Sequence, residues 1–332
     1  IDPLTVPLTD RKVLSIFNGI EALDIKDPDY KFTHGSYAIP EFGTSFVRQM
    51  LDDTKPDKFA DLVRISGFSH GTDVWLNNAQ DYIKQGVATM REVISTRDDI
   101  MNYLMLKGIE NKTSFQIMED VRKNRPLKED QLAVMKEHGV PDWYIWSCEK
   151  IKYMFPKAHA AAYVMMAWRI AYCKVFYPLA YYAAYFSIRA TGFSYELMCQ
   201  GKDRLENYMK DYKKRKDTLS NKEQDVFKDM RIVQEMYARG FDFMPLDIYR
   251  AHPNRFQIID GKLMPAINSI DGLGDNAAIY ISEAAKDGPF LSKDDFRERT
   301  HVSRTAVDLM SDLGLLGSLP ESNQLSLFDF GA

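Results

Sequence analysis

Apolar residues recur at the spacing of an α-helix from about residue 10 to about residue 195, with polar residues between them. The repeat is clearest in four segments, 46–51, 59–65, 79–93 and 97–106. Asp98 and Asp99 stand at the start of the fourth segment, where carboxylates stabilise the positive end of the helix dipole. Helix-breaking residues predict interruptions at Gly43, Gly67, Gly71, Gly108 and Pro141. This part of the chain is therefore expected to be helical.

The most apolar stretch, 160–188, is rich in alanine and tyrosine. Arg169, Lys174 and Pro178 interrupt it, so it predicts a pair of buried helices and no membrane span. Residues 196–239 are polar and charged, with a basic run at 213–216 followed by a predicted helix at 221–238. The basic run is typical of a solvated surface, and contact with phosphate groups is the alternative.

A β-hairpin is predicted at 256–264, because Asp260 and Gly261 separate two short apolar runs and Asp-Gly favours a tight turn. Residues 265–316 then predict a compact helical unit, and no internal repeat of fixed period is found. The predicted fold class is mainly α, with one short β-hairpin and a flexible C-terminal peptide.

Composition limits the possible functions. The 332 residues are 45% hydrophobic, which is enough for two or three domains with cores. The net charge of −4 means that any nucleic-acid site must be a local basic patch. Three distant cysteines, at 148, 173 and 199, indicate neither a disulfide framework nor a zinc cluster, so we expect a reduced, cytoplasmic setting. No N-terminal signal is visible, and the start at Ile1 is interpreted as a cut or processed chain.

Two segments of the helical part combine hydroxyl, imidazole, lysine and aromatic groups. The first, 66–75, predicts a glycine-rich turn that presents Ser69 and His70 before a helix start. In the second, 150–163, Pro156 places Lys157 and His159 near a helix N-terminus. Lysine beside aromatic rings suits a nucleotide, because the charge can meet phosphate and the ring can meet the base. Structural histidines and ordinary core aromatics are the alternatives.

Two glycines bracket one apolar residue at Gly272-Leu273-Gly274, between short predicted helices. Without side chains, backbone N–H groups at this turn can approach a phosphate, and the next helix presents its positive N-terminus. The pattern resembles the helix-hairpin-helix of DNA-binding proteins, which holds a duplex without reading its sequence. A plain helix corner with glycine for close packing is the alternative. The predicted DNA-contacting residues are Gly272, Leu273, Gly274, Asn276 and Arg304.

Two further helix starts are predicted in this unit. Asp275 is expected to cap the helix that follows the glycines, where its charge would repel a phosphate. Ser303 is expected to cap a helix at 304–313, which ends at Gly314.

The tail 324–328 reads Gln-Leu-Ser-Leu-Phe, with no helix or strand period around it. Apolar side chains exposed on a loose tail are costly, so they favour a peptide that becomes ordered on a partner. The pattern resembles the clamp-binding peptide of bacterial replication proteins. Gln324 would then bond at a pocket rim, while Leu325, Leu327 and Phe328 fill a hydrophobic cleft. Packing of the tail on its own domain is the alternative.

These features occur in order, and together they resemble the C-terminal part of the PolC-type alpha subunit of bacterial DNA polymerase III. The resemblance covers essentially the whole chain. It implies fingers at 1–195, a connecting helix and β-hairpin at 196–264, a helix-hairpin-helix duplex-binding domain at 265–316 and a clamp-binding tail at 317–332. It also implies a part of a DNA-directed DNA polymerase in the cytoplasmic replisome, with primer-template DNA, an incoming dNTP, the β sliding clamp and the upstream palm as partners.

The resemblance also implies a set of nucleotide-binding residues. Six come from the two front motifs: Ser69, His70, Phe155, Lys157, His159 and Tyr163. Four more are supported only by charge and helix position: Arg97, Lys107, Arg122 and Lys123.

Polymerases hold two Mg²⁺ ions between convergent carboxylates. Adjacent aspartates occur here at 52–53, 98–99 and 294–295, but neighbours on a helix point about 100° apart. Each pair is therefore predicted to cap a helix or to be solvated. In the family the catalytic aspartates belong to the palm, which precedes the matched segment. We expect no catalytic or metal-binding residue in this chain, and no DNA synthesis by the chain alone.

Two other functional classes stay open. A non-catalytic replication adaptor would bind duplex DNA and the clamp without handling nucleotides, and it would leave the two front motifs without a role. A DNA-repair enzyme can also carry a helix-hairpin-helix, but it would need a metal cluster or a Lys/Asp pair beside the hairpin, and the sequence shows neither.

Overall fold

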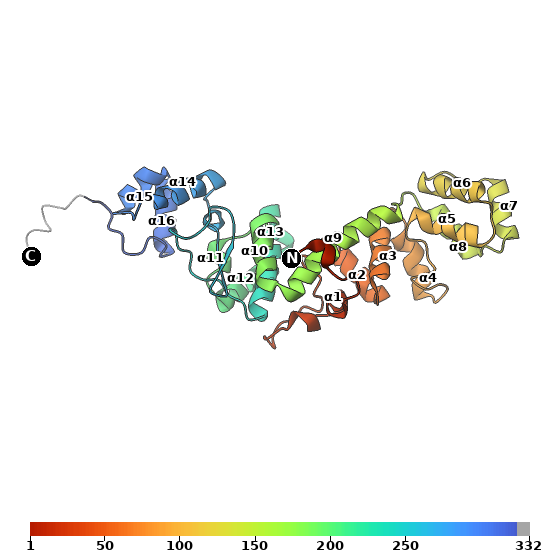
Figure 1. Ribbon diagram of the computed structural model, residues 1–332, viewed down its shortest axis with the longest axis horizontal. Helices are drawn as coiled ribbons and strands as arrows, with labels where there is room; N and C mark the ends of the chain where they lie inside the picture. Colours follow the sequence, from red (N-terminus) through yellow and green to blue (C-terminus); the bar gives the residue numbers. More distant parts are fainter. Residues whose placement is uncertain (324–332) are drawn as a thin grey trace, which may run out of the picture. The chain divides into compact units, whose positions relative to one another are not determined.

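Helices make up most of the structure, a computed structural model that describes residues 1–323 (Figure 1). The described residues form two compact units, one of 1–23 with 31–175 and one of 24–30 with 176–323. The mainly α fold predicted from the sequence is confirmed. The boundary between the two units, after residue 175, comes before residue 195, where the fingers are predicted to end. The limits of the fingers describe a function, and they stay a prediction.

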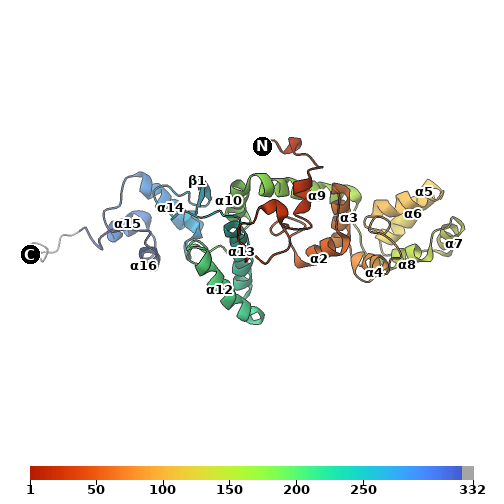
Figure 2. The ribbon, with the colours of Figure 1, turned by 90° about the horizontal axis from the view of Figure 1, so that it is seen from below.

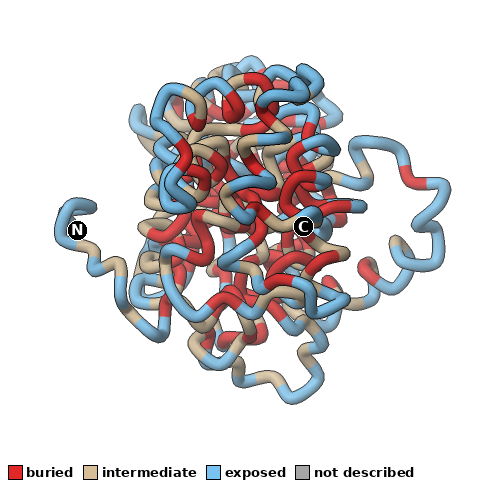
Figure 3. The backbone as a smooth tube through the Cα atoms, turned by 90° about the vertical axis from the view of Figure 1, so that its right-hand side faces the viewer, coloured by how far each residue is buried: buried red, intermediate tan, exposed pale blue. Residues whose placement is uncertain are grey.

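The first unit is built from helices that short turns connect. Their bounds are α1 (Arg11–Ser15), α2 (Ser45–Thr54), α3 (Phe59–His70), α4 (Gln80–Lys84), α5 (Arg97–Leu106), α6 (Asn111–Arg122), α7 (Glu129–Glu137), α8 (Asp142–Lys150) and α9 (Lys157–Phe176), with short helical turns at Pro3–Thr5, Glu21–Leu23 and Trp75–Ala79. Buried positions recur every three or four residues along these helices, as amphipathic helices require. Figure 3 shows buried and exposed stretches interspersed along the described part of the backbone.

Aromatic side chains form the centre of the first unit. Phe17 packs edge-on against Phe42, with ring centroids 4.9 Å apart. Trp168 of α9 lies 6.3 Å from Phe17 and 5.6 Å from Phe59, the first residue of α3. The Trp168 indole N–H donates to the Pro7 carbonyl at 2.9 Å, which satisfies the polar end of this ring. These contacts hold α3 and α9 together, and both helices contribute to the candidate site.

The second unit contains the remaining helices and the β-hairpin. Their bounds are α10 (Pro178–Ile188), α11 (Tyr195–Met198), α12 (Lys202–Lys214), α13 (Asn221–Ala238), β1 (Gln257–Ile259), β2 (Lys262–Met264), α14 (Asp275–Lys286), α15 (Lys293–Thr300) and α16 (Arg304–Asp312), with short helical turns at Lys216–Thr218 and Ile267–Ser269. The strands are antiparallel, and Ile258 is paired with Leu263. The fully buried Ile281, Phe296 and Met310 join α14, α15 and α16 in one core.

Local sequence signals placed several elements correctly. The helix at 221–238 is confirmed, with a capping box between Ser220 and Glu223. The β-hairpin is confirmed, as is the capping of α16 by Ser303, which accepts the Ala306 N–H. The continuous helix predicted at 79–93 is wrong, because α4 ends at Lys84 and Gly86 adopts a φ of +68°. A left-handed residue cannot continue a right-handed helix, so the chain turns there.

Candidate functional site

Two glycines allow three segments to meet at the end of α3. A Cβ at Gly67 would lie 2.7 Å from the Ser95 carbonyl oxygen, and one at Gly71 would lie 2.9 Å from the Tyr153 carbonyl oxygen. The Thr72 N–H donates to that same Tyr153 carbonyl at 2.8 Å. In the segment 66–75, where a glycine-rich turn was predicted, residues up to His70 belong to α3, so a turn that includes Gly67 is wrong. Glycine is needed here because the backbone at Ser95 passes close to the helix.

The start of α5 holds the segment before α9. The Arg97 N–H donates to the Phe155 carbonyl at 3.1 Å, and the Lys157 N–H donates to an Asp98 carboxylate oxygen at 2.6 Å. The α9 helix starts at Lys157, directly after Pro156, as predicted. The segment 153–157 is therefore fixed between the end of α3 and the start of α5.

Five aromatic rings gather at this point, and they are called the ring cluster below: His70, Tyr153, Phe155, His159 and Tyr163. The rings of Phe155 and His159 are stacked with centroids 4.6 Å apart, and Tyr163 lies 4.5 Å from His159. His70 meets the edge of Phe155 at 5.5 Å. Tyr153 and Tyr163 remain 46% and 42% exposed, so part of the cluster faces solvent. Exposed rings that are already stacked can receive another flat ring.

Close contacts at both ring nitrogens fix the orientation of His70. Its Nδ1–H donates to the Ser66 carbonyl at 2.8 Å, and its Nε2 lies 2.8 Å from a Glu41 carboxylate oxygen. The Ser69 hydroxyl donates to the same Ser66 carbonyl at 3.0 Å, so it points along its own helix. The imidazole is held against Phe155 from both of its nitrogens.

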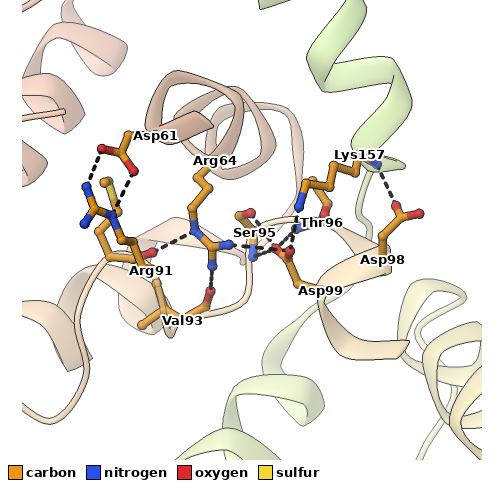
Figure 4. A network of polar contacts seen from close by, with 10 residues as sticks. Asp61, Arg64, Arg91, Val93, Ser95, Thr96, Asp98, Asp99 and Lys157 are labelled. Carbon is orange, nitrogen blue, oxygen red and sulfur yellow. Dashed lines mark hydrogen bonds and ion pairs between the residues drawn. The ribbon is translucent and has the colours of Figure 1, made fainter. Parts of the chain in front are cut away.

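Lys157 connects the ring cluster to a polar network around Asp99 (Figure 4). One Asp99 carboxylate oxygen accepts the Ser95 and Thr96 N–H groups at 3.1 and 2.9 Å. The other lies 3.5 Å from the Arg64 guanidinium and 4.0 Å from Lys157 Nζ. The Lys157 side chain is 52% exposed, so its ammonium group can also meet an external anion.

A hollow of about 330 Å³ opens beside this network. Four cationic side chains line it, together with one carboxylate and apolar groups of α3 and α9: Lys58, Arg64, Arg91, Lys157, Asp61, Phe59, Ala60, Val63 and Ala161. Arg91 binds the buried Asp61 at 2.9 Å and the exposed Asp57 at 2.6 Å. Burial alone would raise the pKa of Asp61, but the hydrogen bond from Arg91 leads the contacts that lower it. Arg91 is thus partly neutralised, whereas Lys157 keeps only a distant carboxylate.

The four residues predicted from charge differ in placement. Arg97 is the first residue of α5 and lies beside Phe155, whereas Lys107 is the C-cap of the same helix. The 10 residues of α5 separate the two ends by about 15 Å, because an α-helix rises about 1.5 Å per residue. Arg122 and Lys123 both bind Glu119 at 2.8 Å, and these contacts lower the pKa of Glu119 to about 2. The structure therefore brings the six motif residues and Arg97 together, but not Lys107.

The glycine turn before α14 leaves backbone open to solvent. Gly272 has a φ of +81°, which only glycine adopts freely. Gly274 has an ordinary φ of −81°, and a Cβ there would have nothing within 4 Å. Neither strain nor packing within the chain requires glycine at 274. It is the N-cap of α14 and provides no side-chain cap, so first-turn N–H groups stay available.

The neighbours of this turn are only partly as predicted. Asp275 is the first residue of α14 and not its cap, and its carboxylate accepts the Asn268 amide at 2.9 Å. The predicted capping role is wrong because Gly274 already occupies the N-cap position. Asn276 is exposed in the first turn, and Leu273 is buried as the anchor of the turn. Arg304 is exposed at the start of α16, and no described interaction joins it to the turn.

Comparisons with known proteins identify the family of the chain. Residues 1–140 match the family described as bacterial DNA polymerase III alpha subunit finger domain, and residues 240–325 match a helix-hairpin-helix motif. The chain is 50% identical over 323 residues to a DNA polymerase III PolC-type of Caldanaerobacter subterraneus subsp. tengcongensis. It is 51% identical over 328 residues to that of Clostridium perfringens and 52% identical over 338 residues to that of Streptococcus mutans.

The chain belongs to the PolC-type DNA polymerase III family. The three matches cover 97%, 99% and 99% of this chain, but the chain spans only 23% of the length of each relative. The resemblance drawn from the motifs is therefore confirmed, and the chain corresponds to a segment of the PolC-type proteins.

Two of the adjacent aspartates in this PolC-type segment, Asp52 and Asp295, bind other groups of the fold. Asp52 lies 3.0 Å from His34 and 2.9 Å from Lys55, and Asp295 accepts the Leu291 N–H at 2.9 Å. Within residues 1–323, no three His, Cys, Asp or Glu side chains are grouped to hold a metal ion. No helix in the described part of the chain is long and apolar enough to cross a membrane.

The predicted clamp-binding residues Gln324, Leu325, Leu327 and Phe328 lie outside the described residues. The chain just before them is tied to α15. Lys293 donates its N–H to the Pro320 carbonyl at 2.9 Å, and Asp294 donates to the Glu321 carbonyl at 3.1 Å. The Lys293 ammonium adds an ion pair with Glu321 at 2.5 Å.

Sequence reasoning missed three residues that complete the site. Tyr153 lies inside the second motif, and its position beside lysines and Phe155 was a usable signal. Asp98 was noted only as a helix-start residue of α5, yet it binds the first N–H of α9. Glu41 contacts His70 from a turn with no distinctive pattern, so only the fold could reveal it.

Proposed function

We propose that this chain supplies the fingers and the duplex-binding part of a replicative DNA-directed DNA polymerase. The complete enzyme would add dNTPs to a primer 3′ end under the direction of a template. The observation that carries the proposal is the half-exposed ring cluster with Lys157 at its edge. Three relatives that are 50–52% identical to this chain are named DNA polymerase III PolC-type, and these names support the same conclusion.

In the nucleotide site, the rings and the lysine would take different parts of the ligand. Phe155, His159 and Tyr163 offer stacked faces to a base, and such stacking contributes about 1–3 kcal/mol per base. Lys157 lies between these rings and the cationic hollow, so its ammonium group would meet the phosphates. His70 is held rigidly by Ser66 and Glu41, which favours a positioning role at the edge of Phe155.

In the second unit, the open backbone at Gly274 would hold a phosphate of the primer-template duplex. The exposed first turn of α14 presents N–H groups and the positive end of the helix dipole to it. Contacts of this kind position a duplex without selecting its sequence. The tail 324–328 would dock on the β sliding clamp, and the preceding residues 320–321 are attached to α15.

The chemical step belongs to another part of the proposed enzyme. Nucleotidyl transfer by two-metal enzymes requires carboxylates around divalent ions such as Mg²⁺. The side chains described here offer no grouping that fits such ions. In line with the family resemblance, we assign the metal ligands to the palm domain. The roles left to this chain are to bind and orient the nucleotide, the duplex and the clamp.

Primer extension tests the proposal. The chain is assayed alone, and then mixed with a segment that contains the palm, using Mg²⁺, dNTPs and a primed template. Activity only in the mixture supports fingers that complete an active site. Activity of the chain alone would contradict the assignment of the metal ligands to the palm. If neither sample is active, crosslinking of a photoreactive dNTP separates the two remaining functions: labelling of residues 150–163 supports the fingers, and its absence favours the adaptor.

A further inference from the structure

The helices α12 and α13 form a hairpin whose closed end is strongly basic. The two helices pack on each other and are joined by residues 215–220, which include a short helical turn. The closed end points away from α10 and α14 of the same unit (Figure 2). Residues 210–222 contain six lysine or arginine residues and two aspartates, whereas the whole chain has a net charge of −4. This segment is therefore a local positive patch on an acidic protein.

One cation of the patch has a structural role. The Arg215 guanidinium binds Asp211 and Glu223, each at 3.0 Å, and so ties the end of α12 to the start of α13. Glu223 also accepts the Ser220 N–H at 2.9 Å in the capping box. The Ser220 backbone, the Ser220 hydroxyl and Arg215 lower the pKa of Glu223 to about 2, in that order. These contacts close the hairpin and neutralise Arg215.

The five lysines of the patch are not used in this way, and they are called the lysine tip: Lys210, Lys213, Lys214, Lys216 and Lys222. All are exposed, and none has an ion-pair partner among the described residues. Lys210, Lys213 and Lys214 are spaced i, i+3 and i+4, so they share one face of α12 and repel one another. The dipole at the end of α12 offsets only part of this repulsion. An external anion would relieve the rest.

The chemistry of the patch favours double-stranded DNA over unpaired nucleotides. Single-strand sites combine cations with exposed aromatic rings on which bases stack. Tyr212 is the aromatic residue of 210–222, and its ring is half-buried, with Phe227 stacked at 6.1 Å and Arg215 at 5.2 Å. Its faces are therefore occupied. Lysine ammonium groups without a stacking ring are suited to the phosphate backbone of a duplex.

We propose that the lysine tip is a second binding site for the sugar-phosphate backbone of duplex DNA, in addition to the glycine turn at 272–274. Both sites belong to the same compact unit. The inference rests on the duplex binding proposed above, and it adds a contact independent of the helix-hairpin-helix motif. The contact is electrostatic and independent of base sequence, because lysines on a surface present charge without a fixed hydrogen-bonding pattern.

The salt dependence of DNA binding tests this proposal. The whole chain is titrated with a fluorescent duplex at several salt concentrations, and compared with a variant in which all five lysines are changed to glutamine. The slope of log Kobs against log[salt] is negative, and each lost phosphate contact reduces its magnitude by about 0.9. Loss of two to four contacts therefore reduces the magnitude by about 2–4. The loss of affinity is largest at low salt. A variant with five arginines is expected to keep the wild-type slope.

A charge-matched control separates a local contact from the effect of net charge. It carries glutamine at five exposed basic positions of the first unit: Arg11, Lys12, Lys84, Lys112 and Lys136. The proposal is overturned if the lysine-tip variant keeps the wild-type slope, if the control loses as much, or if only single-stranded DNA is affected. Failure of the wild-type chain to bind duplex overturns the proposed function and this inference together. Circular dichroism confirms that each variant is folded.

Discussion

The backbone N–H of Lys157 donates to the Asp98 carboxylate at 2.6 Å, so a residue of α5 caps the start of α9. Pro156, which precedes α9, has no side-chain acceptor that could cap it. The cap fixes the helix that carries His159 and Tyr163, and it connects the ring cluster to α5. It also means that one N–H of the α9 terminus is already occupied by a carboxylate. Phosphate binding at this end would therefore depend mainly on the Lys157 side chain.

Changing Asp98 to alanine is expected to lower the free energy of unfolding by about 1 kcal/mol, because an N–H at a helix start loses its acceptor. Changing it to asparagine should have little effect, since the amide oxygen can accept the same bond. Equilibrium urea unfolding measures both. Asp130→Ala is the matched control, because Asp130 is exposed in the first turn of α7. Equal losses at 98 and 130 would show that the cap adds nothing.

The ion pairs of Glu119 are expected to make a pH-dependent contribution to the free energy of unfolding. The hydrogen bonds from Arg122, and next from Lys123, lower its pKa from 4.5 to about 2 in the folded chain. The unfolded chain binds this proton more readily, so the stabilisation is complete above about pH 4.5 and is lost as the pH falls toward 2. Glu119→Gln should therefore reduce stability at pH 7, by less than about 1 kcal/mol for a helix-surface pair.

The same comparison at low pH checks the cause. The difference between wild type and Glu119→Gln in urea unfolding should shrink between pH 4.5 and pH 2. Glu137→Gln, an exposed change on α7, provides the control. A difference that stays constant with pH would indicate lost packing and not a lost ion pair.

Elements defined by neighbouring residues could be predicted from the sequence. The helix α13 follows from Ser220 and Glu223, which form its capping box over three residues. The β-hairpin follows from Asp260 and Gly261, which both adopt positive φ angles. In both cases the stabilising contacts are local, so the pattern contains the information.

Contacts between distant residues could not be predicted in this way. Asp98 and Lys157 are 59 residues apart, and no local pattern pairs them. Gly67 was interpreted as a turn residue, because sequence shows the absence of a side chain but not the backbone at Ser95 that requires it. The motifs contain the rings that the structure brings together, and their role in binding stays a prediction. The partners that orient them, such as Glu41 for His70, depend on the fold.

Phe155→Ala, tested in a complete polymerase, is expected to raise the dNTP KM about 5- to 150-fold. The reason is the loss of a stacking face, which contributes about 1–3 kcal/mol per base. Affinity for primer-template should stay the same, because the proposed duplex contacts lie in the second unit. His70→Ala should show the same preference with a smaller effect. Leu76→Ala, which removes another exposed apolar side chain of the first unit, is the control. Equal losses of dNTP and DNA binding would indicate a structural role.

Gly274→Ser should change stability and DNA binding in opposite directions. Serine is a better N-cap than glycine, and the ordinary φ and open space at 274 admit its side chain. The free energy of unfolding should therefore rise by a few tenths of a kcal/mol. Duplex affinity should fall for all sequences alike, because the side chain separates the phosphate from the N–H groups of α14. Thermal unfolding and fluorescence anisotropy measure the two effects. Loss of affinity for only some sequences would argue against a phosphate contact.

Replacing Leu327 and Phe328 with alanine distinguishes clamp binding from packing of the tail on its own domain. If the tail inserts these side chains into a cleft of the clamp, the affinity for purified β clamp should fall at least about 100-fold. The melting temperature of the chain should then stay unchanged, because residues of a peptide bound only by a partner add nothing to the core. Ser326→Ala, between the two apolar positions, is the control and should bind as wild type does. A lower melting temperature with unchanged clamp affinity would show that the tail packs on its own domain, and it would remove clamp docking from the proposed function.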